Sequence, residues 1–243
     1  MKHSLLTIIG IFSLWQLIIF LFQLPPYILP TPWAVIHTAY LRADLIMHET
    51  FITMIETILG LFFGIVFGCS TALVMAFWRP FKIGLLPILL ISQAIPTFAI
   101  APLLVIWFGY GMAAKIVTTI IMLFFPITST FFDGLRRTDL TWEDLAKTMN
   151  AKKWRFFWYV RIPAALPNLA SGLRVAAAIA PIGAIVGEWV GASQGLGFLM
   201  LNANARMQID LMFAGLFVLV IFSLVLYFII DRTLRLVIPW QNT

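Results

Sequence analysis

One long polar stretch, residues 133–167, interrupts a chain that is otherwise mostly apolar. Over the whole chain, 62% of residues are hydrophobic and 11% are charged, whereas this stretch holds seven of the sixteen lysines and arginines. Such a balance lies outside that of soluble domains, and long apolar runs that do not alternate indicate membrane-spanning helices rather than a barrel. The polar stretch must therefore lie outside the lipid, and its length predicts that it folds against something.

Six apolar segments are long enough to cross a hydrocarbon core of about 30 Å. A short amphipathic surface helix is expected before the second segment, at residues 33–48. The sequence thus predicts an all-α membrane protein with six transmembrane helices, forming one transmembrane domain over residues 1–243 with a core of about 50–232. The expected spans are residues 5–24 (uncleaved rather than a signal peptide), 50–77, 84–108, 113–132, 171–190 and 211–230.

Basic residues concentrate on one side of this predicted topology. That side collects twelve lysines and arginines, counting Lys2, and the other collects Arg42, Lys115 and Arg206. Because positive loops face the cytoplasm, we expect both termini and the polar stretch to be cytoplasmic. The same rule accounts for the formal charge of +6 without a nucleic-acid partner. The expected surroundings are membrane lipid.

The polar stretch carries the signals of a short helix. Thr141 is expected to cap it, and Asp144 three residues later gives a weak capping box. Trp142, Ala146 and Met149 fall at i, i+4 and i+7 and share one face. A small apolar ridge outside the membrane fits a groove on a soluble partner.

A second short helix is expected at about residues 152–159, before Pro163 and Pro167 break the run. Further along, the glycine-rich start of residues 191–210 allows two interpretations. It could be a phosphate cradle or a re-entrant or gating turn, and the turn is favoured because no lysine follows.

Two acidic residues lie within predicted spans, where an ionised group is costly. Glu56 is expected to pair with a neighbouring helix, although it could face the pathway. For Glu188, near the outer end of the fifth span, the two interpretations stay open.

Gln93 and Thr97 flank Pro96 in the third span, and Pro102 follows. These prolines open the backbone hydrogen-bond ladder and can leave carbonyl groups beside a cavity. Gln93, Thr97 and Trp107 are therefore candidate pathway linings, with helix–helix hydrogen bonding as the alternative.

The sequence contains no G-x-x-x-x-G-K-[ST] nucleotide loop, no His/Cys cluster with metal spacing and no Ser/His/Asp arrangement. We therefore expect no enzyme activity, no cofactor and no metal site. Any ATP hydrolysis on which the chain depends must therefore belong to another chain.

The polar stretch resembles the coupling loop of permease subunits in bacterial ATP-binding-cassette importers. The family pattern is Glu-Ala-Ala, three residues, Gly, nine residues, then Ile-x-Leu-Pro. Asparagine is the best substitute for glycine at a left-handed helix end. The matching positions are Asp144-Leu145-Ala146, Asn150, Val160, Ile162 and Pro163.

Further signatures extend the resemblance over about residues 29–240. They are similar to the subgroup that imports taurine, alkanesulfonates, nitrate and thiamine-pyrimidine precursors, and most like its pyrimidine-precursor branch. Glu56 stands where many members carry arginine, which disfavours a sulfonate or nitrate substrate. The signatures are Ile95-Pro96, Ala101-Pro102-Leu103, Trp107-Phe108-Gly109-Tyr110-Gly111, Asp133-Gly134-Leu135-Arg136 and Ser171-Gly172-Leu173-Arg174.

The resemblance implies a type I importer. Two copies of the permease would form a dimer, two ATPase subunits would dock on the central loops, and a periplasmic binding protein would deliver a small solute. The main alternative is an ATP-independent channel or an ion-coupled secondary transporter. The residues implied to couple to the ATPase are Trp142, Glu143, Asp144, Leu145, Ala146, Met149, Asn150 and Pro163.

Overall fold

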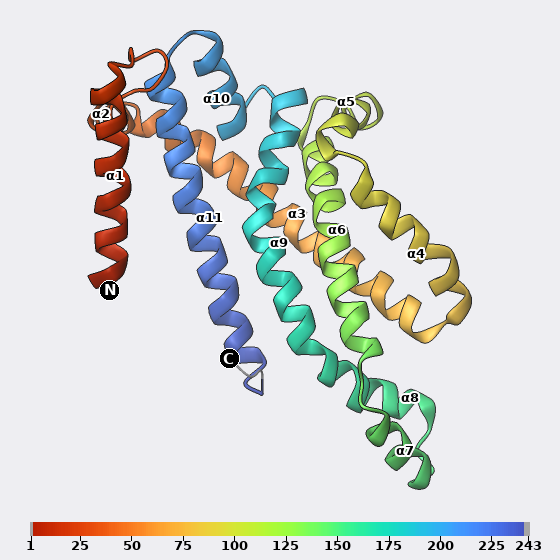
Figure 1. Ribbon diagram of the computed structural model, residues 1–243. Helices are drawn as coiled ribbons and strands as arrows, with labels where there is room; N and C mark the ends of the chain where they lie inside the picture. The colour runs from red at the N-terminus through yellow and green to blue at the C-terminus, as the bar shows by residue number, and fades with distance from the viewer. Residues whose placement is uncertain (1, 241–243) are drawn as a thin grey trace.

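The computed structural model describes residues 2–240, and those residues form helices without any strand (Figure 1). This confirms the all-α prediction. The elements are α1 (Lys2–Phe22), α2 (Pro32–Leu41), α3 (Ala43–Phe77), α4 (Arg79–Ala94), α5 (Thr97–Phe108), α6 (Met112–Arg136), α7 (Leu140–Thr148), α8 (Lys153–Phe156), the π turn η1 (Phe157–Arg161), α9 (Ile162–Gly191), α10 (Leu196–Ala205) and α11 (Ile209–Val237).

Among the described residues, four helices are long and apolar enough to span a membrane: α3, α6, α11 and the run Lys153–Gly191. The predicted third span, residues 84–108, is not one straight helix. Helices α4 and α5 meet at a bend of 104°, because Ile95 is extended before Pro96. The apolar part of α1, Ile9–Phe22, is shorter than the four long spans.

Two predicted boundaries are wrong. The helix expected at residues 33–48 ends at Leu41, and α3 starts at Ala43 after a break at Arg42. The helix expected at 152–159 does not stop before Pro163 and Pro167. Helix α8, η1 and α9 form one continuous run. The π turn η1 ends at Arg161, just before Pro163, and its wider hydrogen-bond spacing lets the helix continue although proline has no N–H to donate.

Helix α6 lies at the centre of the bundle and packs most extensively against α9 and α3. Glycines permit this close approach. A Cβ added to Gly187 of α9 would lie 2.8 Å from the Cα of Lys115 in α6. One added to Gly183 would lie 3.0 Å from the Cα of Thr119. Such small-residue faces are typical of helix pairs in lipid. Helix α3 presents a similar face to α6, with Gly60, Gly64 and Gly68.

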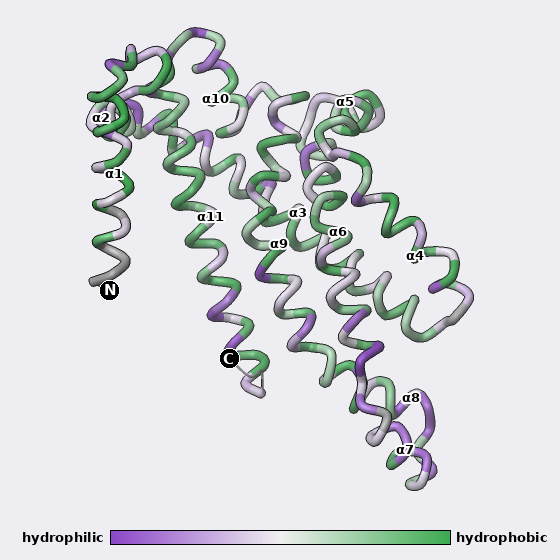
Figure 2. Tube along the Cα trace, in the orientation of Figure 1, coloured by the Kyte–Doolittle hydropathy of each residue, from purple (hydrophilic) through white to green (hydrophobic). Residues whose placement is uncertain are grey.

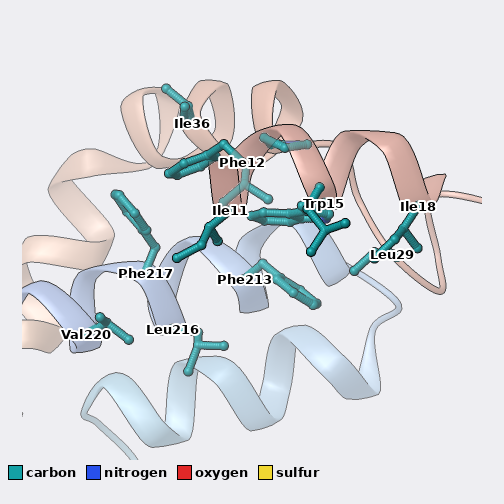
Figure 3. A pocket seen from close by; sticks show the side chains of 13 residues that line it. Ile11, Phe12, Trp15, Ile18, Leu29, Ile36, Phe213, Leu216, Phe217 and Val220 are labelled. Carbon is teal, nitrogen blue, oxygen red and sulfur yellow. The ribbon is translucent and has the colours of Figure 1, made fainter. Parts of the chain in front are cut away.

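The first and last spans meet through aromatic side chains. Trp15 of α1 lies 5.8 Å from Phe213 of α11, and Phe12 lies 6.4 Å from Phe217, measured between ring centroids. Figure 3 shows these rings around an apolar pocket of about 430 Å³ that α2 also borders. Helix α1 thus attaches to the outside of the bundle through α2 and α11.

A continuous hydrophilic region lies at one end of the molecule (Figure 2). Figure 2 shows mostly hydrophobic long helices and a hydrophilic region over α7, α8 and the adjoining end of α6. The start of α1 and the end of α11 both point toward this end (Figure 1). Within the described residues, four helices, or five if the bent pair α4–α5 is counted as one, are long and apolar enough to cross a membrane, so the six predicted crossings stay a prediction.

We predict that Gly187→Ala lowers the thermal stability of the purified protein in detergent. The new methyl group would meet the backbone of α6 at Lys115, and overpacking of this kind costs about 1–3 kcal/mol. The matched control is Gly84→Ala in α4, where a Cβ has nothing within 4 Å and alanine favours the helix. Equal melting temperatures for the two variants would contradict the close α6–α9 contact.

Candidate functional site

Asp139, in place of the predicted Thr141, caps the start of α7. The Asp139 carboxylate accepts hydrogen bonds from the N–H (2.9 Å) and the O–H (2.7 Å) of Thr141. The backbone N–H of Thr141, followed by its hydroxyl, lowers the pKa of Asp139. Asp139 is the N-cap residue because a carboxylate is a stronger acceptor than a hydroxyl for the first backbone amides of the helix. Asp144 instead accepts a bond of 2.9 Å from the Lys147 ammonium, so the predicted capping box does not form.

The other end of α7 has the conformation predicted for it. Asn150 has a φ of 51°, in the left-handed region. Its N–H donates to the Lys147 carbonyl, and the N–H of Ala151 donates to that of Ala146, each at 2.9 Å. This pair of bonds is a Schellman motif, which ends a helix sharply. Asn150 therefore serves as the glycine-like stop that the sequence indicated.

Helix α7 exposes an apolar ridge that lacks a partner within the described chain. Trp142 is 49% exposed, Leu145 is 59% exposed and Met149 is 73% exposed. Ala146 lies on the same face as Trp142 and Met149, at the edge where the ridge meets a groove between α7 and the spans. Exposed large apolar side chains beyond the end of a long helix indicate an interaction surface.

Contacts tie the polar stretch to the spans. Glu143 of α7 lies 3.9 Å from the Arg161 guanidinium in η1 and 3.7 Å from the Lys147 ammonium. The Pro163 carbonyl accepts a hydrogen bond of 3.3 Å from the Trp240 indole. Pro163 is thus held by the C-terminal segment, and α7 is linked to the helix that continues into α9.

The Glu56 carboxylate in α3 pairs with the Lys115 ammonium in α6, at 2.5 Å. Both side chains are buried, with exposed fractions of 1% and 8%. In this structure Glu56 therefore pairs with a neighbouring helix, as its structural interpretation expects. The sequence pattern grouped Lys115 with Arg42 and Arg206, so this pair was not predicted. Its position inside the predicted fourth span was the available signal, since a buried cation requires an anion.

Glu188 is also buried, near the C-terminal end of α9. Its Oε1 accepts a hydrogen bond of 2.6 Å from the Thr53 hydroxyl, and its Oε2 accepts one of 2.5 Å from the N–H of Gly197. These bonds connect α9 to α3 and to the start of α10. The two acids thus occupy helix contacts in this conformation.

The amide groups at the start of α10 bind side chains of the same chain. The N–H of Gly195 donates to Glu49 at 2.5 Å, and that of Leu196 donates to the Thr53 hydroxyl at 2.8 Å. Gly195 has a φ of 113°, which favours glycine. The segment is a turn held by α3, in agreement with the favoured interpretation, and its amides are not open for a phosphate.

The candidate lining residues of the third span lie on the bent pair α4–α5. Gln93 and Trp107 are exposed, and Thr97 is half-buried. All three are therefore at the surface of a single chain, where a second copy could enclose them. Their role in a pathway stays a prediction.

We predict that Lys115→Met strongly destabilises the protein, because it leaves the Glu56 carboxylate buried without its partner. Breaking a buried pair in this way costs about 3–5 kcal/mol. The double variant Glu56→Gln/Lys115→Met removes both charges and should regain most of the loss. Melting temperature and yield of monodisperse protein in detergent measure both effects. A double variant no better than the single one would show that the charge is not the cause.

Comparison with known proteins matches residues 60–242 to the family model described as "Binding-protein-dependent transport system inner membrane component". The chain is 54% identical over 231 residues to a probable ABC transporter permease protein of Haemophilus influenzae, covering 95% of this chain and 94% of the relative. It is 35% identical over 218 residues to the formylaminopyrimidine transport permease protein ThiX of Halalkalibacterium halodurans, covering 89% and 87%.

A riboflavin transport system permease protein, RibX of Chloroflexus aurantiacus, is 31% identical over 237 residues, covering 97% of this chain and 88% of the relative. Among solved structures, an inward-facing MetNI methionine ABC transporter matches with a TM-score of 0.70 at 22% identity, covering 80% of this chain and 97% of that chain. At that identity the match shows the fold alone.

Proposed function

The chain belongs to the family of inner membrane components of binding-protein-dependent transport systems, and from this premise we propose that it carries a thiamine-pyrimidine precursor across the membrane. It is a permease subunit of an ABC importer, and ATP hydrolysis belongs to a separate subunit. The observation that carries the coupling part of the proposal is the exposed ridge of Trp142, Leu145 and Met149 on α7.

In this proposal the ridge docks into a groove on the ATPase. Its apolar residues form the core of the contact, and charged residues such as Lys147 and Lys152 lie at the rim. The hydrogen bond from Lys147 to Asp144 raises the pKa of the ammonium. Lys147 therefore remains charged at neutral pH and fixes the polar edge of the ridge.

The geometry also supports a route for transmitting motion. Glu143 links α7 to Arg161, and α8, η1 and α9 form one continuous run of 39 residues. Displacement of α7 would therefore tilt α9, and α6 would move with it because their backbones are in close contact. At the far end, the bond between Glu188 and Thr53 joins α9 to α3. Movement at the ATPase could thus reach the opposite end of the spans through rigid helices.

The assembly that follows from this proposal contains two permease copies, two ATPase subunits and one periplasmic binding protein. The bent pair α4–α5 supports a contact with a second copy, because Phe98, Ile106 and Trp107 are each at least two-thirds exposed there. The chain would lie in the bacterial inner membrane with both termini and α7 in the cytoplasm.

The substrate is proposed from the relative named for formylaminopyrimidine, which is more similar to this chain than the relative named for riboflavin. Glu56 does not add to that choice. Its carboxylate is neutralised by Lys115 and buried, so it gives no reason to expect a cationic ligand. An ion-coupled transporter would need acids along a proton route, but Glu56 and Glu188 are held in helix contacts.

We predict that Met149→Arg abolishes association with the co-expressed ATPase and leaves the membrane fold intact. A charge in the centre of an apolar contact loses its water without gaining a partner, which costs at least 2–3 kcal/mol and thus about 100-fold in affinity. Thr148→Arg is the matched control, because it adds the same charge at an exposed position off the ridge. A pull-down from detergent extracts compares the two. Undiminished association of the Met149 variant would exclude the docking role.

We predict that proteoliposomes holding this chain, its ATPase and its binding protein take up labelled formylaminopyrimidine only with internal ATP. Liposomes with the chain alone should show no uptake, because the translocating helices need the ATPase to move them. Riboflavin at the same concentration is the comparison ligand. Uptake of riboflavin instead would reassign the substrate, and uptake without ATPase would favour the channel or ion-coupled alternative.

A further inference from the structure

A groove of about 450 Å³ lies between α7, the end of α3 and the α8–η1 segment. Aromatic side chains surround it at the point where α3 leaves the bundle. Phe77 contacts Trp154 and Phe157, each at 5.4 Å between ring centroids. Trp78, also against Phe77 at 5.1 Å, is half exposed. Partly exposed tryptophans gather where a membrane protein crosses the headgroup layer. The groove therefore lies at the level of the lipid headgroups.

The polar part of the groove is predominantly positive. Lys147, Lys153 and Arg161 line it, and Glu143 is the acid among its lining residues. The positive charge of Lys147 is partly balanced, because its ammonium also contacts the Asp144 carboxylate outside the groove. Lys153 and Arg161 are thus the cations best placed to meet an external anion. A basic pocket beside spans on the cytoplasmic side is the chemistry that binds anionic lipid headgroups.

Arg161 provides a second, independent observation. Its Nε is buried and has no hydrogen-bond partner among the described residues, and its guanidinium reaches Glu143 only at 3.9 Å. A buried guanidinium donor without an acceptor is costly. A phosphate oxygen is the acceptor that suits guanidinium geometry.

We propose that this groove binds one anionic phospholipid, with its phosphate against Lys153 and Arg161 and its acyl portion against Phe77. The aromatic floor distinguishes a lipid from a free anion, since inorganic phosphate or a sugar phosphate gains nothing from apolar rings. The assignment uses the proposed cytoplasmic side of α7 but no feature of the transported solute. The lipid would lie between α7 and the end of α3 and would set the resting position of the coupling helix.

Native mass spectrometry of the full chain in detergent tests the proposal. Phosphatidylglycerol is titrated, with phosphatidylcholine of the same acyl chains and soluble glycerol 3-phosphate as comparisons. We expect one tightly bound phosphatidylglycerol per chain and weaker binding of both comparison ligands. Lys153→Gln/Arg161→Gln should weaken phosphatidylglycerol binding about 30-fold, since each cation near a lipid phosphate contributes about fivefold.

Lys152→Gln/Arg155→Gln is the matched control. It removes the same charge from exposed side chains that do not line the groove, so the affinity should stay nearly unchanged. Lys153→Gln alone, at an exposed position, keeps the test valid if the Arg161 change harms folding, and it should weaken binding about fivefold.

Equal losses in the two double variants, or equal binding of phosphatidylcholine, would overturn the assignment. Binding of glycerol 3-phosphate as tight as that of the lipid would show a soluble-anion site instead. Release of the lipid when the ATPase is added would assign the groove to the ATPase contact. None of these outcomes bears on the Met149→Arg pull-down, so the two proposals fail separately.

Discussion

The close approach of α6 to α3 and α9 is the constraint on which the rest of the structure depends. In lipid, apolar side chains gain nothing by leaving one apolar environment for another, so helix pairs are held by packing and by internal hydrogen bonds. Glycines on both flanking helices bring their backbones against α6 at distances that a Cβ would prevent. This contact packs α3, α6 and α9 against one another along their backbones, and the proposed transmission of motion depends on it.

The same close packing permits buried charge. Glu56 and Lys115 lie on the α3 and α6 faces that approach each other, and their 2.5 Å contact excludes lipid and water alike. Thr53 and Glu188 extend the polar contacts to α9 and to the start of α10. A buried pair is weak evidence for stability, because desolvation offsets most of its attraction. Its larger effect is on specificity, since any sliding of α6 along α3 would separate the charges.

Sequence periodicity and composition could predict the helices, their approximate number and the polar stretch, because lipid leaves few alternatives to a helix. Asn150 could be predicted as a left-handed stop, because that signal is local. Pairing between distant helices could not be predicted from the sequence. Lys115 lies near a predicted span end, where a cation can also reach the headgroups, and 59 residues separate it from Glu56. The continuous α8–α9 run was missed for a related reason, since a π turn before Pro163 leaves no clear mark in the sequence.

The two polar regions of the molecule differ in how far their side chains are bonded within the chain, and this difference bears on how a permease can move. At the end away from α7, Glu188, Thr53 and the amides of α10 bind one another, so these groups are not open to a partner. At the other end, α7 leaves Trp142, Leu145 and Met149 exposed, and Arg161 keeps an unpaired donor. A body that exposes an apolar ridge at one end offers partners a binding surface at that end. Energy supplied by a partner at α7 would therefore be transmitted through the rigid helices, and the outer contacts would set how much is needed before they rearrange.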